Sequence, residues 1–242
     1  MSHHRLRLLA STAALGVASI ALAGCVVSLP VVGDQTQSTD DFTVSDSVRG
    51  LLVEAAADVT VAIGDEPQLT ISGPESTLER VTVKERDGML VIGTTGRGIN
   101  LRGLDVNLTV TAFEQLELAG AGDVVAEFTG ASEARITVAG AGDVDATGID
   151  ADTLTVLIAG AGSVRLAGEA QTAAYTVDGA GEIDATALVA SDATAEIAGA
   201  GSIALHATDT VDAQTAGIGE IRIQGGADVT RRVDGLGTIT ED

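Results

Sequence analysis

Apolar and polar residues alternate along most of the chain, in runs short enough to be single strands. Leu116 and Leu118 are separated by one polar residue, and so are Ile136 and Val138 one repeat later. Side chains two residues apart lie on the same face of a β-strand. This period of two therefore predicts strands with one buried and one solvent-facing side.

The alternation is interrupted by copies of one six-residue motif, which reads Ala-Gly-Ala-Gly-Asp-Val in its first two copies. Seven copies follow one another at intervals of 18 to 20 residues: Ala119–Val124, Ala139–Val144, Ala159–Val164, Asp178–Ile183, Ala198–Ile203, Ala216–Ile221 and Asp234–Ile239. A unit of this length cannot bury its apolar face alone, so it must stack on its neighbours. We expect a seven-repeat β-solenoid over residues 114–242, about 34 Å long at the usual strand spacing.

The Gly-x-Gly of each motif lies between two predicted strands, and we interpret it as a sharp corner of the coil. Glycine suits a corner because it has no Cβ to restrict the backbone. The structural corners are Gly120, Gly122, Gly140, Gly142, Gly160, Gly162, Gly179, Gly181, Gly199, Gly201, Gly217, Gly219, Gly235 and Gly237. Between these glycines stands Ala in five copies, which suits a corner with little room. Ile218 and Leu236 replace it in the last two copies and would fill a cap where the stack ends.

Residues 48–113 also show short alternating runs, without the repeated motif. Asp87-Gly88 between two such runs predicts a hairpin or tight turn, and Gly73–Leu78 predicts a loop with at most one helical turn. This region is either a set of irregular β coils that continue the solenoid or a small separate β layer. We favour irregular coils.

The N-terminus has the three parts of a secretory signal peptide over residues 1–24. Arg5 and Arg7 precede a short apolar stretch, and Leu22, Ala23 and Gly24 lead directly to Cys25. The tetrapeptide from Leu22 to Cys25 resembles the lipobox of bacterial lipoproteins, and this resemblance implies a diacylglycerol thioether on Cys25 and cleavage before it. The alternatives are an ordinary signal peptide with a chance cysteine, or an uncleaved apolar tail. Because Cys25 is the only cysteine of the chain, we favour lipidation.

Residues 25–47 then predict a lipidated, flexible tether. The segment holds Pro30 and a polar run from Gly33 to Asp41, and it shows no sustained periodicity. Such a tether would let an exported solenoid stand clear of the membrane on its extracytoplasmic side.

The charge of the chain limits its partners. The formal charge is −22, and without Arg5 and Arg7 the remaining 11 basic residues stand against 35 acidic ones, a charge of −24. Such a surface repels phosphate backbones, so we expect no nucleic-acid partner. It would also be repelled by anionic headgroups, so we expect membrane attachment through the lipid and not through a basic patch.

The run from about Val48 to Ile239, strands followed by tandem Gly-Ala-Gly-Asp-Val, resembles the bacterial DUF2807 family of auto-transporter adhesin heads with a GIN domain. The resemblance implies a right-handed parallel β-helix and a role in cell adhesion, and it supplies no catalytic residues. This chain departs from the motif where Ser163, Glu182, Ser202, Glu220 and Thr238 replace its Asp.

No pattern in the chain predicts catalysis or a cofactor. Gly120-Ala-Gly122 lacks the third glycine and the following helix of a dinucleotide site. His206 is the only histidine outside the signal peptide, and no nucleophile-elbow sequence accompanies it. The only lysine, Lys84, and the scattered Arg135, Arg165 and Arg222 do not predict the cleft of a lyase. The near absence of aromatic residues also argues against stacked sugars.

The residue after each Gly-x-Gly forms a predicted column of oxygen-bearing side chains: Asp123, Asp143, Ser163, Glu182, Ser202, Glu220 and Thr238. Several carboxylates could bind Ca²⁺, but Ser and Thr dilute the charge. We therefore expect a solvated corner and no metal site. The sequence as a whole predicts an exported lipoprotein whose non-catalytic solenoid serves adhesion or binding at the cell envelope. An accessory scaffold that spaces envelope components is the alternative, and a polysaccharide-acting enzyme is less favoured.

Overall fold

The computed structural model describes residues 36–95 and 103–242, which lie in one compact unit from Gln35 to Asp242. Its strands are β1 (Gln37–Thr43), β2 (Gly50–Val53), β3 (Asp58–Ile63), β4 (Gln68–Pro74), β5 (Val81–Arg86), β6 (Met89–Thr94), β7 (Asp105–Val110), β8 (Gln115–Leu118), β9 (Val124–Glu127), β10 (Gly130–Val138), β11 (Val144–Ile158), β12 (Ala161–Val177), β13 (Ala180–Ile197), β14 (Ala200–Thr215), β15 (Ile218–Gln224), β16 (Asp228–Val233) and β17 (Thr238–Glu241). One helical turn, α1 (Glu75–Leu78), follows β4. The expected single helical turn is therefore confirmed.

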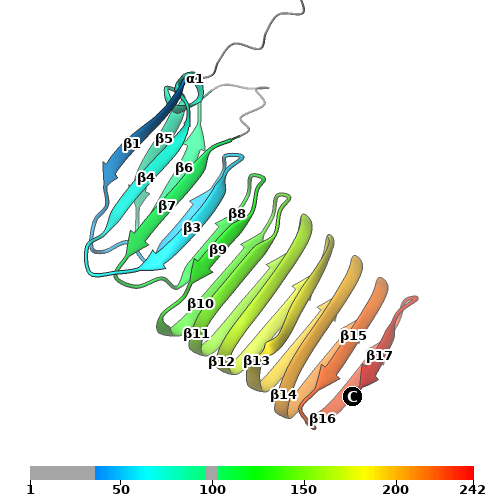
Figure 1. Ribbon diagram of the computed structural model, residues 1–242. Coiled ribbons are helices and arrows are strands. Elements are labelled where there is room, and N and C mark those ends of the chain that lie inside the picture. The colour runs from blue at the N-terminus through cyan, green and yellow to red at the C-terminus, as the bar shows by residue number, and fades with distance from the viewer. Residues whose placement is uncertain (1–35, 96–102) are drawn as a thin grey trace, which may run out of the picture. The chain divides into compact units, whose positions relative to one another are not determined.

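From β8 onward the chain winds into stacked coils, which Figure 1 shows as a ladder of parallel strands. On both sides of the corners, residues pair with their counterparts one repeat later, as Val144 does with Val164 and Ile158 with Val177, and the register shifts between Ala146 and Ile149. The longest strands run through the loop that joins one coil to the next, so a single strand belongs to two coils. The sequence-based prediction of an all-β, parallel solenoid is confirmed.

The solenoid interior is a set of columns in which each coil places an apolar side chain directly over the previous one. One column runs Leu116, Ile136, Val156, Tyr175 and Ala195, and every member is buried. In this column Tyr175 is followed by two small residues, Ala195 and Ala213, in the next two coils. Its hydroxyl has no hydrogen-bond partner, and burial raises the pKa of the phenol.

The glycine corners are packed directly on one another. A Cβ added to Gly160 would lie closer than 3.0 Å to the carbonyl oxygens of Gly140 and Ala139 in the preceding coil. The same overlap with a carbonyl of the preceding coil occurs at thirteen of the fourteen corner glycines, and at Gly237 the obstacle is the Thr215 side chain. A positive φ is a lesser reason for glycine at the corners. It occurs at Gly122, with φ of 122°, but at neither Gly120 nor Gly160. The corners therefore need glycine mainly because the coils approach so closely.

The middle residue of each corner points outward, which corrects one expectation. Ala121, Ala141 and Ala161 are exposed, so space does not restrict this position. Ile218 is 61% exposed and Leu236 is 81% exposed. These two side chains do not fill a cap.

Residues 48–113 join the solenoid ladder, but not in chain order. Strand β2 lies between β6 and β8, because Leu51 pairs with both Leu90 and Leu116. Strand β3 likewise lies between β7 and β9. The coil that comes first in the sequence is thus inserted between two later ones. Antiparallel pairs add to this end, namely β1 with β4, β4 with β7, and β5 with β6.

The expected tether is too long at its C-terminal end. Residues Gln37–Thr43, placed in the tether by their polarity, form β1 and pair in register with β4 from Gln68 to Pro74. Val44 is buried. The side chains of β1 are mostly exposed, which suits polar residues. Backbone pairing with β4, and not burial of apolar side chains, therefore holds β1 in place. The signal peptide, the lipobox and Cys25 lie outside the described residues.

The last coil of the described residues ends the apolar core with charges. Arg231 pairs in register with buried Ala213, and Glu241 with buried Ile223, so both occupy core columns. Their side chains form an ion pair. A charge at an inward position discourages another strand from adding to an open edge. Over residues 36–95 and 103–242, no helix is long and apolar enough to cross a membrane.

We expect Gly160→Ala to destabilise the solenoid by about 1–3 kcal/mol or more, because the new methyl must displace backbone of the preceding coil. The matched control is Ala161→Ser at the exposed middle position of the same corner, which should change stability by less than about 0.5 kcal/mol. Urea denaturation followed by circular dichroism measures both. Equal midpoints for the two variants would contradict the packing argument.

We expect the double variant Arg231→Leu/Glu241→Leu to associate, because it leaves an apolar core open beside unpaired strand edges. Sedimentation velocity should show a larger species that grows with concentration, while the unaltered chain remains monomeric. Arg232→Leu is the control, since it adds the same side chain to an outward position of the same coil. Association of this control to the same extent would contradict a special role for the inward charges.

Candidate functional site

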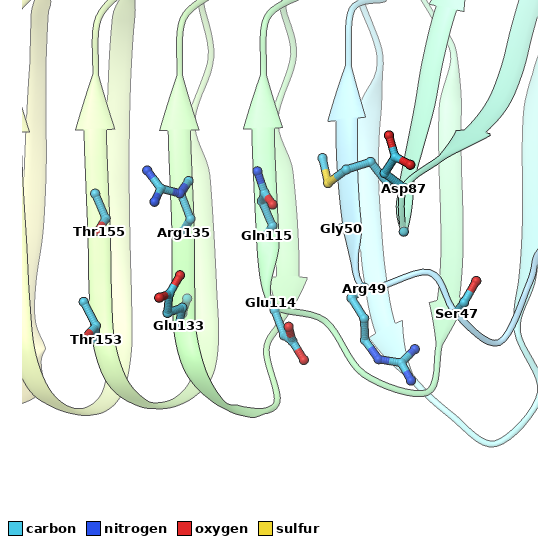
Figure 2. Close-up of a pocket in the computed structure, with 13 residues that line it drawn as sticks. Ser47, Arg49, Gly50, Asp87, Glu114, Gln115, Glu133, Arg135, Thr153 and Thr155 are labelled. Atoms are coloured by element: carbon cyan, nitrogen blue, oxygen red, sulfur yellow. The ribbon is translucent and has the colours of Figure 1, made fainter.

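A polar groove of about 470 Å³ crosses the outer face of the solenoid near its inserted coil. Figure 2 shows it running from the β5–β6 turn over the start of β2 to β8, β10 and β11. Gly50, Gln115, Arg135 and Thr155 lie side by side across these four strands, because they are register partners. The groove thus begins where the chain order of the coils is broken.

Two glycines shape the end of the groove at β2. A Cβ at Gly50 would collide with the Met89 sulfur, so the absence of a side chain lets Met89 lie over this position. The turn Asp87-Gly88 has φ of 52° and 79°, as the favoured two-residue hairpin turn requires. The Gly88 carbonyl accepts the backbone N–H groups of Arg49 and Gly50 at 2.9 and 3.2 Å. The predicted hairpin therefore fixes the start of β2.

The two arginines of the groove differ in what they contact. Arg49 Nη1 donates to the carbonyl oxygens of Asp46 and Val48, at 2.6 and 2.8 Å, and to Thr111 Oγ1 at 3.3 Å. Its guanidinium is thus used to hold the chain before β2. Arg135 is exposed, and no ion pair or side-chain hydrogen bond joins it to another described residue. Arg135 therefore offers a free guanidinium to a ligand.

Three carboxylates line the same groove as this guanidinium. Glu133 precedes Arg135 by two residues on the same outer face of β10, while Glu114 and Asp87 also line the groove. Thr153 and Thr155 add hydroxyls on the next strand. The lining holds these carboxylates and hydroxyls but no histidine, cysteine or lysine. Its groups can bind charged and polar parts of a ligand.

The predicted oxygen column has a structural use in its first coils. The backbone N–H of Asp123 donates to Asp58 Oδ1 at 3.2 Å, and that of Asp143 donates to Asp123 Oδ1 at 3.3 Å. The Ser163 hydroxyl and backbone N–H donate to Asp143 Oδ1 at 2.8 and 2.9 Å. These bonds, with the Ser163 hydroxyl foremost, hold the pKa of Asp143 below its usual value. Each carboxylate thus accepts a corner N–H from the next coil.

The column continues in register through Glu182, Ser202, Glu220 and Thr238. In these later coils the residues of the column belong to strands that begin at the corner itself, at Ala161, Ala180 and Ala200. Their backbone N–H groups are therefore part of the parallel ladder. Within the part of the chain that the structure describes, no three His, Cys, Asp or Glu side chains are grouped to hold a metal ion.

A family model described as "Putative auto-transporter adhesin, head GIN domain", DUF2807, matches residues 49–227. The chain belongs to the DUF2807 family. No curated protein matches it. Its fold is similar to the crystal structure of a putative adhesin from Bacteroides fragilis, with 26% identity and a TM-score of 0.81 over 86% of this chain and 98% of that one.

Two further crystal structures share the fold of this DUF2807 protein. A putative lipid binding protein from Parabacteroides distasonis is 22% identical with a TM-score of 0.69, and a putative adhesin from Parabacteroides merdae is 23% identical with a TM-score of 0.63. Each match covers 87% of this chain and 98% of the other. Because both are less than 25% identical to this chain, these two matches show the shared β-solenoid fold.

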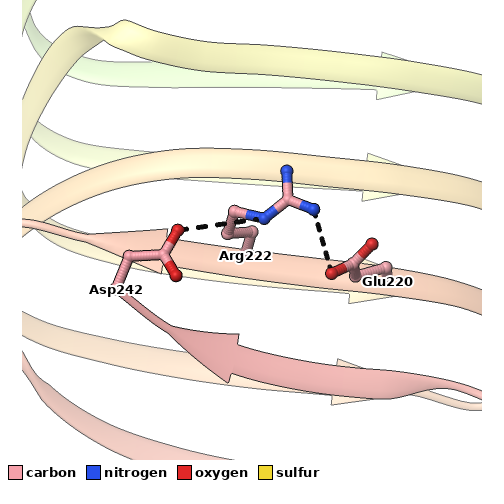
Figure 3. Close-up of polar contacts among 3 residues, drawn as sticks. All are labelled: Glu220, Arg222 and Asp242. Carbon is pink, nitrogen blue, oxygen red and sulfur yellow. Dashed lines mark hydrogen bonds and ion pairs between the residues drawn. The ribbon is translucent and has the colours of Figure 1, made fainter.

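The other singled-out residues of this DUF2807 protein lie away from the groove. His206 is in β14, partly exposed, where it pairs in register with Val189 and Gln224. Arg222 is bound at the last coils, by Glu220 at 3.0 Å and by Asp242 at 3.9 Å, as Figure 3 shows. Neither residue belongs to the groove lining.

Sequence reasoning missed the groove, although it noticed Arg135 as one of several scattered arginines. One signal was available in the repeats. Gln115, Arg135 and Thr155 occupy the same position of successive repeats, four residues before each Ala-Gly-Ala, so alignment of the repeats places them side by side. The contributions of Gly50 and the Asp87-Gly88 turn carry no such signal, because they depend on the inserted coil.

Proposed function

We propose that this chain is an exported lipoprotein whose solenoid is a non-catalytic binding module, serving adhesion at the cell envelope. The observation that carries the proposal is the groove on the outer face of the coils, which offers an unpaired guanidinium beside carboxylates and hydroxyls. Family membership adds support, since two of the structurally similar proteins are named adhesins.

Membrane attachment through Cys25 is part of this proposal. Eleven residues separate Cys25 from the first residue of β1, Gln37. Fully extended, such a segment reaches about 40 Å. This reach is shorter than that expected from a tether of 25–47, and it still lets the solenoid stand off the bilayer surface.

The polar character of the groove bears on the alternatives. One structurally similar protein is named a lipid binding protein, but a groove lined by Arg135, Glu114 and Glu133 does not suit an acyl chain. A scaffold that only spaces other envelope components would make no use of a groove that combines a guanidinium with carboxylates and hydroxyls. A polysaccharide-acting enzyme is less favoured because the groove, although it holds carboxylates, has no aromatic ring on which a sugar could stack.

The binding function predicts that the purified chain captures an envelope component in a saturable way. Surface-immobilised chain, with Cys25→Ser to keep it free of lipid, is exposed to solubilised envelope fractions, and excess soluble chain competes for the captured material. Capture that saturates and is competed supports binding. Signal that rises linearly and resists competition would favour the scaffold alternative.

Lipidation predicts that Cys25→Ser abolishes labelling by an alkyne fatty-acid probe and leaves unprocessed precursor. The reason is that the thiol is the acceptor of the diacylglyceryl group. Labelled bands in cell extracts are compared for the unaltered chain, Cys25→Ser, and a Ser28→Ala control in the same segment. Labelling that survives in Cys25→Ser would place the anchor elsewhere.

A further inference from the structure

We propose that the Arg135 groove binds the charged end groups of a short peptide, with Arg135 taking the carboxylate and Glu133 taking the ammonium. This inference rests on the proposed binding function and names the class of ligand. The inference is based on Arg135, the arginine of the groove that forms no ion pair or side-chain hydrogen bond with another described residue, and on the acidic residues that line the same groove.

Arg135 differs from the other arginines that line the groove or end the solenoid. Arg49 donates to two carbonyl oxygens and one hydroxyl, while Arg222, Arg231 and Arg232 are in ion pairs with carboxylates. Arg135 has carboxylates nearby and yet pairs with none of the described ones within 4.0 Å. A planar guanidinium in this state is suited to a bidentate contact with a ligand carboxylate.

The groove also offers an acceptor for a cation at a defined separation. Glu133 and Arg135 project from the same face of β10, two residues apart (Figure 2). Two residues of strand span about 6.6 Å. The ends of an extended dipeptide are separated by about 7 Å. The two charges of such a molecule are therefore about as far apart as the Cα atoms that carry Glu133 and Arg135, so each charge can lie over one of the two side chains.

Neighbouring groups favour a peptide over other charged ligands. Gln115 and Thr155 flank Arg135 in register on the two adjoining strands, and their amide and hydroxyl can bond to peptide N–H and C=O groups. The groove lacks the aromatic rings on which sugars stack. A polyanion is excluded, because Asp87, Glu114 and Glu133 line the same groove and the whole chain is strongly acidic.

The experiment uses L-alanyl-L-alanine as the probe, titrated into the ¹⁵N-labelled mature chain and followed by NMR. We expect millimolar or tighter binding with shifts confined to β8, β10 and β11. N-acetyl and C-amide forms of the dipeptide should each bind about tenfold more weakly, since a charge-assisted hydrogen bond contributes about that factor. Arg135→Gln should weaken binding of the free dipeptide as much as amidation of its carboxylate does. Glu133→Gln should weaken it as much as acetylation of its amine does.

The matched control is Arg165→Gln, an exposed arginine in β12 that does not line the groove; it should leave the dissociation constant unchanged. Thermal unfolding shows whether each variant remains folded. The inference is overturned if the dipeptide causes no shifts at millimolar concentration, if blocking both ends leaves affinity unchanged, or if Arg165→Gln weakens binding as much as Arg135→Gln. Competed capture of envelope material without dipeptide binding would overturn this inference and leave the binding function standing.

Discussion

The close stacking of one corner on the next governs this structure. At each Gly-x-Gly the carbonyl oxygens of one coil lie against the Cα atoms of the glycines above, with no room for a methyl group. Backbone N–H groups of the upper coil donate to those same carbonyls, as Ala141 does to Gly120 and Ala161 to Gly140, each at 2.9 Å. Because the contact is between backbones, it fixes the register on both sides of each corner, while the register shifts only in the stretches that join one coil to the next.

That register determines what the outer face can present. A residue at a given place in the repeat lies beside its counterpart in the next coil, so small sequence changes between repeats become neighbouring side chains on one surface. Gln115, Arg135 and Thr155 come from three repeats and form one row of the groove. The apolar columns beneath them keep the face rigid, since their members are buried and pack in register. A preorganised surface binds with less loss of conformational entropy than a mobile loop would.

The repeat could be derived from sequence because its signals are local. Strand period and corner glycines recur within each 18 to 20 residues, and both follow from the geometry of one coil. The inserted coil could not be derived in this way. Whether β2 pairs with β4 or lies between β6 and β8 depends on contacts between segments far apart in the chain. The position of Gly50 beside Gln115, and hence the end of the groove at β2, depends on that same non-local pairing. The polar strand β1 was missed because backbone pairing, and not apolar burial, holds it in place.

The distribution of ion pairs separates the last coils from the middle of the solenoid. Among the described residues, all four ion pairs within 4.0 Å involve Arg222, Arg231 or Arg232, at the last coils. There an inward pair replaces apolar packing where the core ends. Exposed ion pairs add little stability. The inward pair of Arg231 and Glu241 therefore acts mainly by closing the end of the stack. In the middle of the solenoid, where neighbouring coils already cover the core, a charge is not needed for that purpose. Arg135 and Arg165 are both exposed there without an ion pair, and only Arg135 lies in the groove beside carboxylates. That location, and not the lack of an ion pair alone, favours contact with a ligand.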